Sequence, residues 1–233
     1  MIDVLGYAIS DYYRNTSPGK LFINNKYGAK EKMPLVIYFR NMRNMPEMEI
    51  IAMRKCRGKV LDIGAGAGSH ALVLQQKGFD VTALEISKKA CEVMKDRGIL
   101  KVVHKDIYLY KKEQFDTLLL LMNGIGFTGT IQRLREFLQH AKSLLKPGGQ
   151  LLFDSSDIAY LYKNRQPPPD VYYGEVVYQY EYKDQKTAWF KWLYIDRKTL
   201  RKVAEEEGWK TKVLFDDGSD QYLARLRLKA EQS

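Results

Sequence analysis

The sequence is poor in cysteine, proline and histidine. Its 233 residues include two cysteines, Cys56 and Cys91, seven prolines and three histidines. Two cysteines are too few for a disulfide framework or a thiolate metal site, and His104 and His140 have no partner at a metal-binding spacing. We therefore expect no bound metal, a reducing cytoplasmic location, and cysteines that serve as small buried apolar residues.

Long apolar runs are absent as well. The longest run, from Leu118 to Met122, has the length of a buried strand, whereas a helix that spans a bilayer needs about 18 or more apolar residues. Mean hydropathy is −0.40. The first ten residues lack a basic segment followed by an apolar one, so we expect neither a membrane span nor a secretory leader.

Positively charged residues outnumber negatively charged ones. Lysine and arginine total 38 against 28 acidic residues, which gives a formal net charge of +10. Basic residues form only pairs, such as Lys88-Lys89 and Lys111-Lys112, and no longer block. This pattern favours a basic cytosolic protein with scattered lysines and leaves a nucleic-acid partner open, though not favoured.

Strand and helix patterns alternate between Lys59 and Asp157. Apolar strands are predicted at residues 59–63, 80–84, 101–104, 115–121 and 150–154, and helices at 69–78, 87–97 and 131–145. Such alternation with short loops predicts an α/β fold with a doubly wound, mostly parallel sheet. A sheet of this kind binds ligands at the carboxyl ends of its strands.

The pattern changes outside this region. Three consecutive prolines, Pro167 to Pro169, predict a connector over residues 163–173. Residues 176–182 and 187–195 alternate around a polar turn and predict a hairpin, followed by a helix at 199–207 and strands at 212–215 and 222–228. We therefore divide the chain into an N-terminal cap at 1–58, with a helix near 47–55, and a ligand-binding domain at 59–233. Within that domain, residues 160–196 form the connector and aromatic hairpin insertion.

A glycine loop follows the first predicted core strand. Gly64, Gly66 and Gly68 alternate before a helix that begins near Ser69, so a ligand can approach bare backbone and free N–H groups. The dinucleotide fingerprint requires its third glycine at position 69, where this chain has serine. Glu85 ends the next strand, where a carboxylate can accept hydrogen bonds from both ribose hydroxyls. The pattern indicates a nucleoside-bearing cofactor and does not specifically indicate a pyrophosphate.

A second acidic residue ends the third strand. Asp106 could accept a hydrogen bond from an adenine amino group, with Ile107 supplying a backbone N–H. Asp106 could equally serve as a turn or cap residue.

Taken together, these segments resemble class I S-adenosylmethionine-dependent methyltransferases. The matching stretches are residues 61–68 (LDIGAGAG), 83–85 (ALE), 105–107 (KDI), 115–118 (FDTL) and 144–152 (LLKPGGQLL), in the family's order. The resemblance implies a Rossmann-like sheet of seven strands whose last strand is antiparallel and inserted beside its neighbour. It also implies S-adenosylmethionine as cofactor, bound through Asp62, Gly64, Ala65, Gly66, Glu85, Ile86, Asp106, Ile107, Met122 and Asn123.

The methyl acceptor is less constrained. The loop after the fourth core strand, Met122-Asn123-Gly124-Ile125, lacks the two prolines typical of enzymes that methylate amino groups of nucleic-acid bases. Asn123, Asp154 and Arg40 are candidates to orient an acceptor, and no catalytic residue is assigned. Cap or surface roles remain open for Asp154 and Arg40.

Two aromatic sets border the core. The N-terminal segment resembles the lid of similar enzymes and carries Tyr12, Tyr13, Tyr27, Tyr38, Phe39 and Arg40. The hairpin carries Tyr178, Tyr180, Tyr182, Trp189, Phe190, Trp192 and Tyr194, for which we favour packing over a substrate wall.

We expect methyl transfer by direct displacement to a small-molecule acceptor, without a membrane partner. The alternative is a methyltransferase that acts on RNA or protein. An NAD-dependent oxidoreductase and a non-catalytic cofactor-binding adapter are less favoured. The oligomeric state is not predicted.

Overall fold

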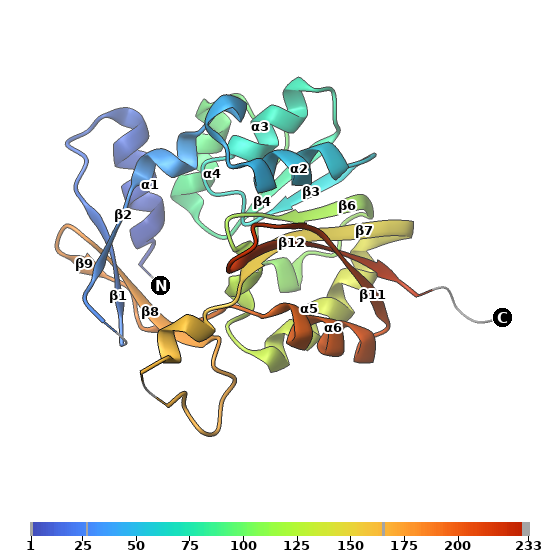
Figure 1. The fold of residues 1–233 in the computed structure, drawn as a ribbon. Helices are drawn as coiled ribbons and strands as arrows, with labels where there is room; N and C mark the ends of the chain where they lie inside the picture. The colour runs from blue at the N-terminus through green and yellow to red at the C-terminus, as the bar shows by residue number, and fades with distance from the viewer. Residues whose placement is uncertain (1, 27, 165, 230–233) are drawn as a thin grey trace. The chain divides into compact units, whose positions relative to one another are not determined.

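The computed structural model describes residues 2–26, 28–164 and 166–229. The chain, traced in Figure 1, divides into two compact units. Unit 1 comprises residues 1–45, 61–110 and 177–190, and unit 2 comprises residues 46–60, 111–176 and 191–233. We describe each unit by itself.

The larger sheet has seven strands in the order β11-β12-β7-β6-β3-β4-β5. Their bounds are β3 (Val60–Ile63), β4 (Val81–Glu85), β5 (Val102–His104), β6 (Phe115–Leu120), β7 (Leu145–Ser156), β11 (Trp209–Asp216) and β12 (Gln221–Leu228). β4 and β5 are parallel, as are β6 and β7. β12 is antiparallel to both of its neighbours, β7 and β11. This order confirms the predicted mostly parallel sheet with the last strand inserted.

The α-helices are α1 (Val4–Arg14), α2 (Glu47–Lys55), α3 (Ser69–Gln76), α4 (Lys88–Asp96), α5 (Ile131–Leu144) and α6 (Arg197–Glu206). Side chains cap the N-termini of α1, α4, α5 and α6, whereas Pro46 and Gly68 precede α2 and α3 without a side-chain cap. The Ser87 hydroxyl accepts a hydrogen bond from the Ala90 N–H at 3.0 Å, as the sequence predicts for an N-cap. Thr130 and Asp196 cap α5 and α6 in the same way.

Helix α5 is held in unit 2 by one apolar stripe. Phe137, Leu138 and Ala141 follow Leu134 by three, four and seven residues. All four side chains are fully buried. This spacing places them on one face of an α-helix. The remaining face is polar, which explains why the sequence identifies the helix correctly.

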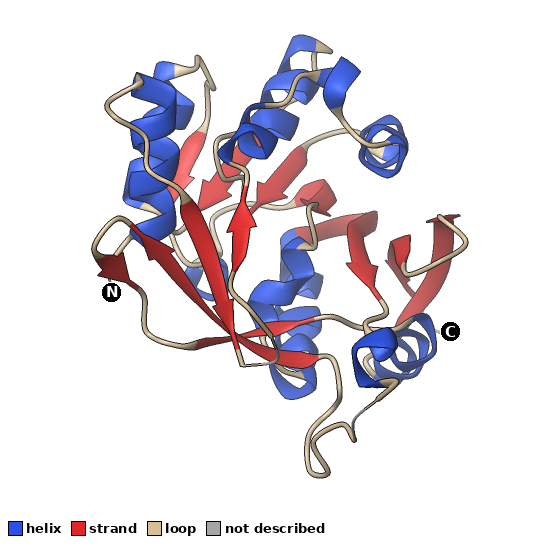
Figure 2. Ribbon diagram, turned by 60° about the vertical axis from the view of Figure 1, so that its left-hand side comes forward, coloured by secondary structure: helices blue, strands red, loops and turns tan. Residues whose placement is uncertain are grey.

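A smaller sheet was not predicted in this form. Its strand order is β10-β8-β1-β2, with β9 also paired to β8, and the strands of both sheets are red in Figure 2. The bounds are β1 (Leu21–Asn25), β2 (Glu31–Met33), β8 (Glu175–Tyr182), β9 (Gln185–Lys186) and β10 (Phe190–Leu193). In unit 1, β1 pairs antiparallel with β8, and Leu21 lies opposite Tyr182. The N-terminal strands and the aromatic hairpin therefore share one sheet.

Several predicted boundaries differ from the structure; for example, the strand expected at 212–215 extends over 209–216. Two further differences follow from strand pairing. The strand expected at 187–195 is shorter and covers only β10 (Phe190–Leu193), while pairing with β8 begins earlier, in β9. Gln185 already pairs with Tyr182 across a tight turn in which Lys183 has φ of 52°. β7 begins at Leu145 rather than Gln150, because Leu145 pairs with Phe115 of β6 before a local irregularity in the register. The connector expected at 163–173 contains residue 165, which lies outside the described residues.

Short 3₁₀ helices connect several elements. They are η1 (Leu35–Phe39), η2 (Met42–Asn44), η3 (Ile107–Leu109), η4 (Gly124–Thr128) and η5 (Ala159–Tyr162). η1 bears the predicted lid residues Tyr38 and Phe39, η3 bears Ile107, and η4 directly follows Asn123.

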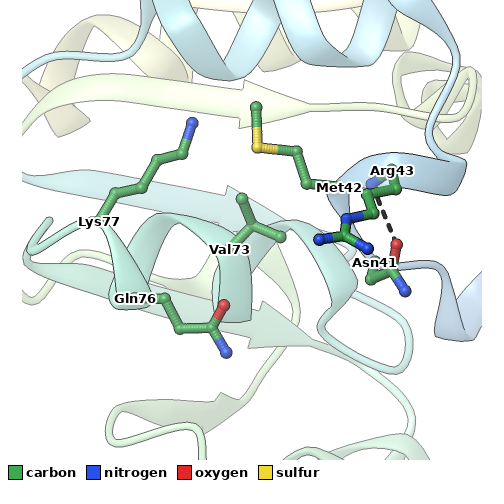
Figure 3. A pocket seen from close by; sticks show the side chains of 6 residues that line it. All are labelled: Asn41, Met42, Arg43, Val73, Gln76 and Lys77. Carbon is green, nitrogen blue, oxygen red and sulfur yellow. Dashed lines mark hydrogen bonds between the residues drawn. The ribbon is translucent and has the colours of Figure 1, made fainter.

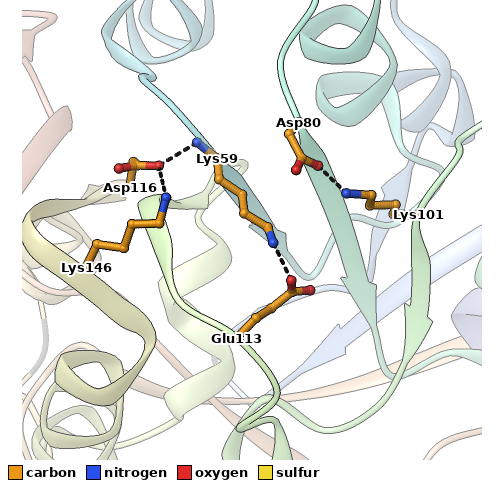
Figure 4. A network of polar contacts seen from close by, with 6 residues as sticks. All are labelled: Lys59, Asp80, Lys101, Glu113, Asp116 and Lys146. Atoms are coloured by element: carbon orange, nitrogen blue, oxygen red, sulfur yellow. Dashed lines mark hydrogen bonds and ion pairs between the residues drawn. The ribbon is translucent and has the colours of Figure 1, made fainter.

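Polar contacts hold the first residues of the core strands. In unit 2, Asp116 accepts hydrogen bonds from the Lys59 N–H at 2.7 Å and from Lys146 Nζ at 2.9 Å (Figure 4). The hydrogen bond from Lys146 is the main cause that lowers the pKa of Asp116. In unit 1, Lys101 Nζ and Asp80 form a separate ion pair at 2.6 Å. Such exposed pairs contribute little to stability, and they lie outside the predicted site.

No helix in the described part of the chain is both long enough and apolar enough to cross a membrane.

Candidate active site

The glycine loop connects β3 to α3 within unit 1. Gly64, Gly66 and Gly68 all have positive φ, of 71°, 56° and 79°, a conformation that glycine adopts at little cost. The carbonyl of Leu84 in β4 accepts hydrogen bonds from the N–H groups of Gly64 at 2.9 Å and Ala65 at 3.2 Å. No heavy atom beyond its chain neighbours lies within 4 Å of the point where a Cβ on Gly64 would project. The main chain at Gly64 is therefore open to a ligand.

Glu85 ends β4 and closes the loop. Its Oε2 accepts a hydrogen bond from the Gly66 N–H at 2.9 Å, and its Oε1 accepts from Ile86 at 2.8 Å and Ser87 at 2.9 Å. Burial raises the pKa of Glu85, and the three N–H groups oppose that shift. The next side chain, Ile86, is 67% exposed, so an apolar surface adjoins a fixed carboxylate.

Asp62 is a buried carboxyl group one residue before the end of β3. It is 2% exposed, and its Oδ2 has no hydrogen-bond partner among the described residues. Burial raises its pKa to about 6, while the charge of His70 and the Ala71 N–H act in the opposite direction. His70 is itself buried in the first turn of α3. Asp62 thus retains acceptor capacity for a hydrogen-bond donor.

Asp106 and Ile107 lie at the start of η3 in unit 1. Asp106 Oδ1 accepts a hydrogen bond from the Tyr108 N–H at 2.9 Å, so this residue acts as a cap. Ile107 is 6% exposed. The cap uses one carboxylate oxygen, and contact with adenine stays a prediction for both residues.

The lid helix, which we define as η1 (Leu35–Phe39), is attached to the glycine loop. The Tyr38 ring lies beside Gly66: a Cβ built there would be 3.2 Å from Tyr38 Cδ1. The Tyr38 carbonyl accepts a hydrogen bond from Ser69 Oγ at 2.6 Å. Burial raises the pKa of Tyr38 well above its usual value, and the negative charge of Glu85 adds to the shift. Tyr38 and Glu85 therefore border the same loop within unit 1.

Arg97 completes this attachment and was missed in the sequence. Its guanidinium donates hydrogen bonds to the Ala67 carbonyl and, at 3.4 Å, to the Tyr38 carbonyl. It also lies 5.0 Å from the centroid of the Phe39 ring. The sequence shows only an arginine before a helix-ending glycine, which carries no local signal for contact with residues 38 and 39.

Other predicted lid residues vary in placement. The rings of Tyr12 and Tyr13 in α1 stack on Phe39, with centroids 5.1 Å and 6.0 Å away. Arg40 directly follows the lid helix and is half-buried. Residue 27 lies outside the described residues.

In unit 2, a strained turn follows β6. Met122 and Asn123 both have positive φ, of 60° and 57°, which is uncommon for residues other than glycine. The Asn123 N–H donates a hydrogen bond to Oδ2 of Asp154 at 2.8 Å, and Asp154 is 6% exposed in β7. Both polar atoms of the Asn123 carboxamide are buried without partners among the described residues. A buried amide without protein partners is costly, so its hydrogen bonds call for a partner such as a ligand or an ordered water.

The aromatic side chains of the hairpin mostly pack against other residues of the protein. Tyr182 is 2% exposed and belongs to the core cluster of unit 1. In unit 2, Trp192 lies against Gly126 of η4, where a Cβ would be 2.0 Å from the indole nitrogen. Trp189 is 46% exposed. Packing therefore accounts for Tyr182 and Trp192, as predicted, while Trp189 remains at the surface.

Both cysteines are buried, as predicted, and neither forms a disulfide. Burial raises the pKa of Cys91 to about 12, so its thiol stays protonated and is a poor nucleophile.

A surface cavity of about 310 Å³ in unit 1 lies apart from the predicted residues (Figure 3). It is lined by Asn41, Met42, Arg43, Val73, Gln76 and Lys77. None of these belongs to the predicted cofactor site, and the cavity has no assigned role.

Comparison with known proteins places these features in a family. The family model described as a methyltransferase domain matches residues 38–212. A solved S-adenosylmethionine-dependent methyltransferase from Bacteroides fragilis, in complex with S-adenosyl-L-homocysteine, is 36% identical, with a TM-score of 0.89. That alignment covers 97% of this chain and 94% of the other.

Two curated relatives are more distant. A glycine/sarcosine N-methyltransferase from Aphanothece halophytica is 25% identical over 70% of this chain and 71% of its own length. The enzyme of the same name from Halorhodospira halochloris is 29% identical over 60% of this chain and 57% of its own length. The family model covers well over half of the chain and the Bacteroides enzyme matches nearly all of it, so the chain belongs to the methyltransferase domain family as a class I S-adenosylmethionine-dependent methyltransferase.

Proposed function

We propose that this protein transfers a methyl group from S-adenosylmethionine, by direct displacement, to the nitrogen of a small amine. The main support for S-adenosylmethionine as the cofactor is the Glu85 carboxylate, which three backbone N–H groups fix beside the open main chain of Gly64. The acceptor part rests on the buried, partnerless carboxamide of Asn123.

The residues of unit 1 fit the cofactor's chemistry. An ionised carboxylate offers about four acceptor sites, and the three backbone donors of Glu85 use two on Oε1 and one on Oε2. One ribose hydroxyl would therefore bind at the remaining site on Oε2, and a second would have to replace a backbone donor. The open backbone at Gly64 and the free acceptor Oδ2 of Asp62 would serve the amino-acid part. Ile86 and Ile107 would contact adenine. When bound, S-adenosylmethionine supplies a methyl group on a sulfonium that is already activated for transfer.

The protein's own contribution would be alignment and exclusion of water. With an activated methyl donor, holding the nucleophile in line supplies much of the rate enhancement. The lid helix, bonded to the loop through Tyr38, would keep water from the bound cofactor. Aromatic rings such as Tyr38 are better neighbours for a sulfonium than lysines are.

Asn123 and Asp154 are assigned to the acceptor. The Asn123 carboxamide can donate to or accept from an amine, and it has no competing partner among the described residues. Asp154 would be a positioning residue, because its carboxylate holds the Asn123 backbone at 2.8 Å. No role in catalysis is assigned to Arg40.

A small amine is favoured over a polymer by two features. The curated relatives named above act on glycine and sarcosine, as their names say. In addition, Gly124 and Ile125 follow Asn123 where enzymes that methylate nucleic-acid bases usually carry prolines.

The test is methyl transfer from radiolabelled S-adenosylmethionine to a panel of small amines and amino acids, with tRNA and a protein extract as polymer arms. We expect label in at least one small amine, and loss of that label in the Glu85→Gln variant. Lys111→Gln, at an exposed site outside the site residues, is the matched control. Label that appears only in RNA or protein would contradict the acceptor class. Absence of label from every arm, despite cofactor binding, would contradict enzymatic turnover.

A further inference from the structure

We propose that one face of the β11–β12 strand pair in unit 2 is a docking surface for the phosphodiester backbone of a nucleic acid. We call it the cationic face. Its members are Arg57, Lys210, Lys212, Arg225 and Arg227.

Strand register brings four of these cations together. In the antiparallel pair β11–β12, Lys210 lies opposite Arg227 and Lys212 lies opposite Arg225. Residues directly opposite each other project from the same face of a sheet. The alternate residues of β12, including Tyr222, Ala224 and Leu226, are buried on the other face, where Arg197 of α6 lies 5.2 Å from the Tyr222 ring.

Arg57 is the fifth member. It follows α2, which packs against β12 within unit 2. The pKa of Arg227 is lowered first by burial and then by the positive charges of Arg225 and Arg57. Arg225 and Arg57 therefore both lie close enough to Arg227 for their charges to repel it.

This arrangement opposes stability, because like charges directly opposite on neighbouring strands are destabilising. Within the described part of the chain, no acidic side chain forms an ion pair with Lys210, Lys212, Arg225 or Arg227. Nearby cations do have such partners: Lys229, directly after β12, pairs with Glu205 at 3.3 Å, and Arg197 of α6 pairs with Asp216 of β11 at 2.6 Å. The cationic face is thus left for an external anion to neutralise.

The chemistry of the face favours phosphodiesters. Guanidinium groups form paired hydrogen bonds with phosphate oxygens, and Arg225 and Arg227 repeat every second residue, about 7 Å apart along the strand. Such a row matches a linear polyanion with regularly spaced charges. Lys210, Lys212 and Arg227 are exposed, and Arg225 is half-buried.

A membrane surface is a poorer fit. Binding to a bilayer usually adds buried apolar side chains to the electrostatic attraction. Leu228 is a large exposed apolar residue of β12, at 41%, and strand alternation places it on the opposite face from Arg225 and Arg227.

The cationic face is distinct from the acceptor residues of the same unit. Asp154 in β7 pairs with Leu223 of β12, whereas Arg225 pairs with Leu152, nearer the amino end of β7. Arg227 lies further still in that direction. The surface would therefore anchor a nucleic acid without presenting a base to Asn123, and the inference does not depend on the proposed acceptor.

The experiment measures anisotropy of a fluorescent oligouridylate of about 20 nucleotides at several KCl concentrations, without cofactor. The test variant carries Lys210→Gln, Lys212→Gln, Arg225→Gln and Arg227→Gln. The control carries Lys111→Gln, Lys112→Gln, Lys198→Gln and Lys202→Gln, all exposed, so that both lose four charges. We expect the test variant to bind at least about tenfold more weakly at low salt. We also expect the slope of its plot of log affinity against log salt concentration to be smaller in magnitude by about 3, because each of the four lost phosphate contacts contributes roughly 0.7 to that slope.

Folding is monitored by thermal unfolding, and we expect no loss in the test variant because a repulsion is removed. Should that variant unfold, Lys210→Gln with Lys212→Gln on the exposed edge strand replaces it, with about half the change in slope expected. Equal losses in test and control variants would reduce the effect to net charge and overturn the proposal. Binding to phosphatidylglycerol vesicles or polyglutamate with none to RNA would also overturn it, in favour of a membrane or an acidic protein.

Discussion

At the scale of single residues, Asp62 is a buried acid with a raised pKa. Its ordinary value is 3.8, and burial raises it to about 6. A carboxyl group with a higher pKa in the folded state binds its proton more tightly there. The stability that this proton contributes is present below pH 4 and is lost as the pH rises from about 4 to about 6.

The Asp62→Asn variant removes this loss, since an amide cannot ionise. We therefore expect the stability of the variant relative to wild type, measured as the difference in free energy of unfolding, to be about 2 to 3 kcal/mol higher at pH 7.5 than at pH 4. Urea unfolding of both proteins at the two pH values measures the difference. A difference that does not change with pH would contradict a raised pKa at Asp62.

Asn123 combines a positive φ with a buried carboxamide. The Asn123→Gly variant removes the carboxamide and eases the backbone, because glycine adopts positive φ freely. We expect kcat/KM for the acceptor to fall about tenfold or more, which corresponds to a loss near 1.4 kcal/mol. The affinity for S-adenosylhomocysteine should stay within about twofold of wild type. The unfolding temperature should stay within a few degrees of wild type. Unchanged kcat/KM in steady-state assays would remove Asn123 from the acceptor site.

At the scale of elements, the lid helix is bonded to the glycine loop through Arg97 and Ser69. Arg97→Ala breaks the bonds to two carbonyl groups and the contact with Phe39. We expect S-adenosylhomocysteine to dissociate about tenfold faster, equivalent to about 1.4 kcal/mol, and amides of residues 35–39 to exchange hydrogen faster. Stopped-flow displacement and hydrogen exchange measure the two effects.

Arg14→Ala is the matched control for this prediction. Arg14 belongs to the same unit and forms an exposed ion pair with Asp96 at 3.1 Å, next to Arg97 in the chain. Because exposed pairs contribute little, neither rate should change. Equal acceleration in both variants would show that loss of an arginine, rather than release of the lid helix, is responsible.

The elements also show how far the sequence predicts the structure. The core strands and helices follow local signals that the chain carries in full: apolar strands, the Ser87 cap and the glycines after β3. The pairing of β1 with β8 joins Leu21 to Tyr182, about 160 residues apart, and no local pattern encodes it. The contact of Arg97 with Tyr38 and Phe39 is equally non-local, so it was missed.

The local geometry of the candidate site could be predicted only for residues that lie on the core motif. The loop glycines and Glu85 have the geometry that their spacing indicates, and Asp106 has the cap role left open for it. The side chain of Asn123 was placed correctly at a strand end, but its lack of buried partners could not be read from sequence. That property depends on packing around η4 and β7.

At the scale of the whole molecule, strand order explains why the family resemblance extends to the C-terminus. β12 is last in the chain yet lies between β11 and β7 and runs antiparallel to both. That arrangement was implied by the resemblance rather than by periodicity, and the 0.89 TM-score with the Bacteroides enzyme agrees with it.

Calorimetric titration of S-adenosylhomocysteine into the wild-type protein and the Glu85→Gln variant, with NAD as comparison ligand, tests the central claim most directly. The account predicts saturable heat from S-adenosylhomocysteine and none from NAD. It also predicts at least about tenfold weaker binding in the variant, because the carboxylate that would accept the ribose hydrogen bonds is gone. No heat from S-adenosylhomocysteine, or an affinity that Glu85→Gln leaves unchanged, would contradict the account.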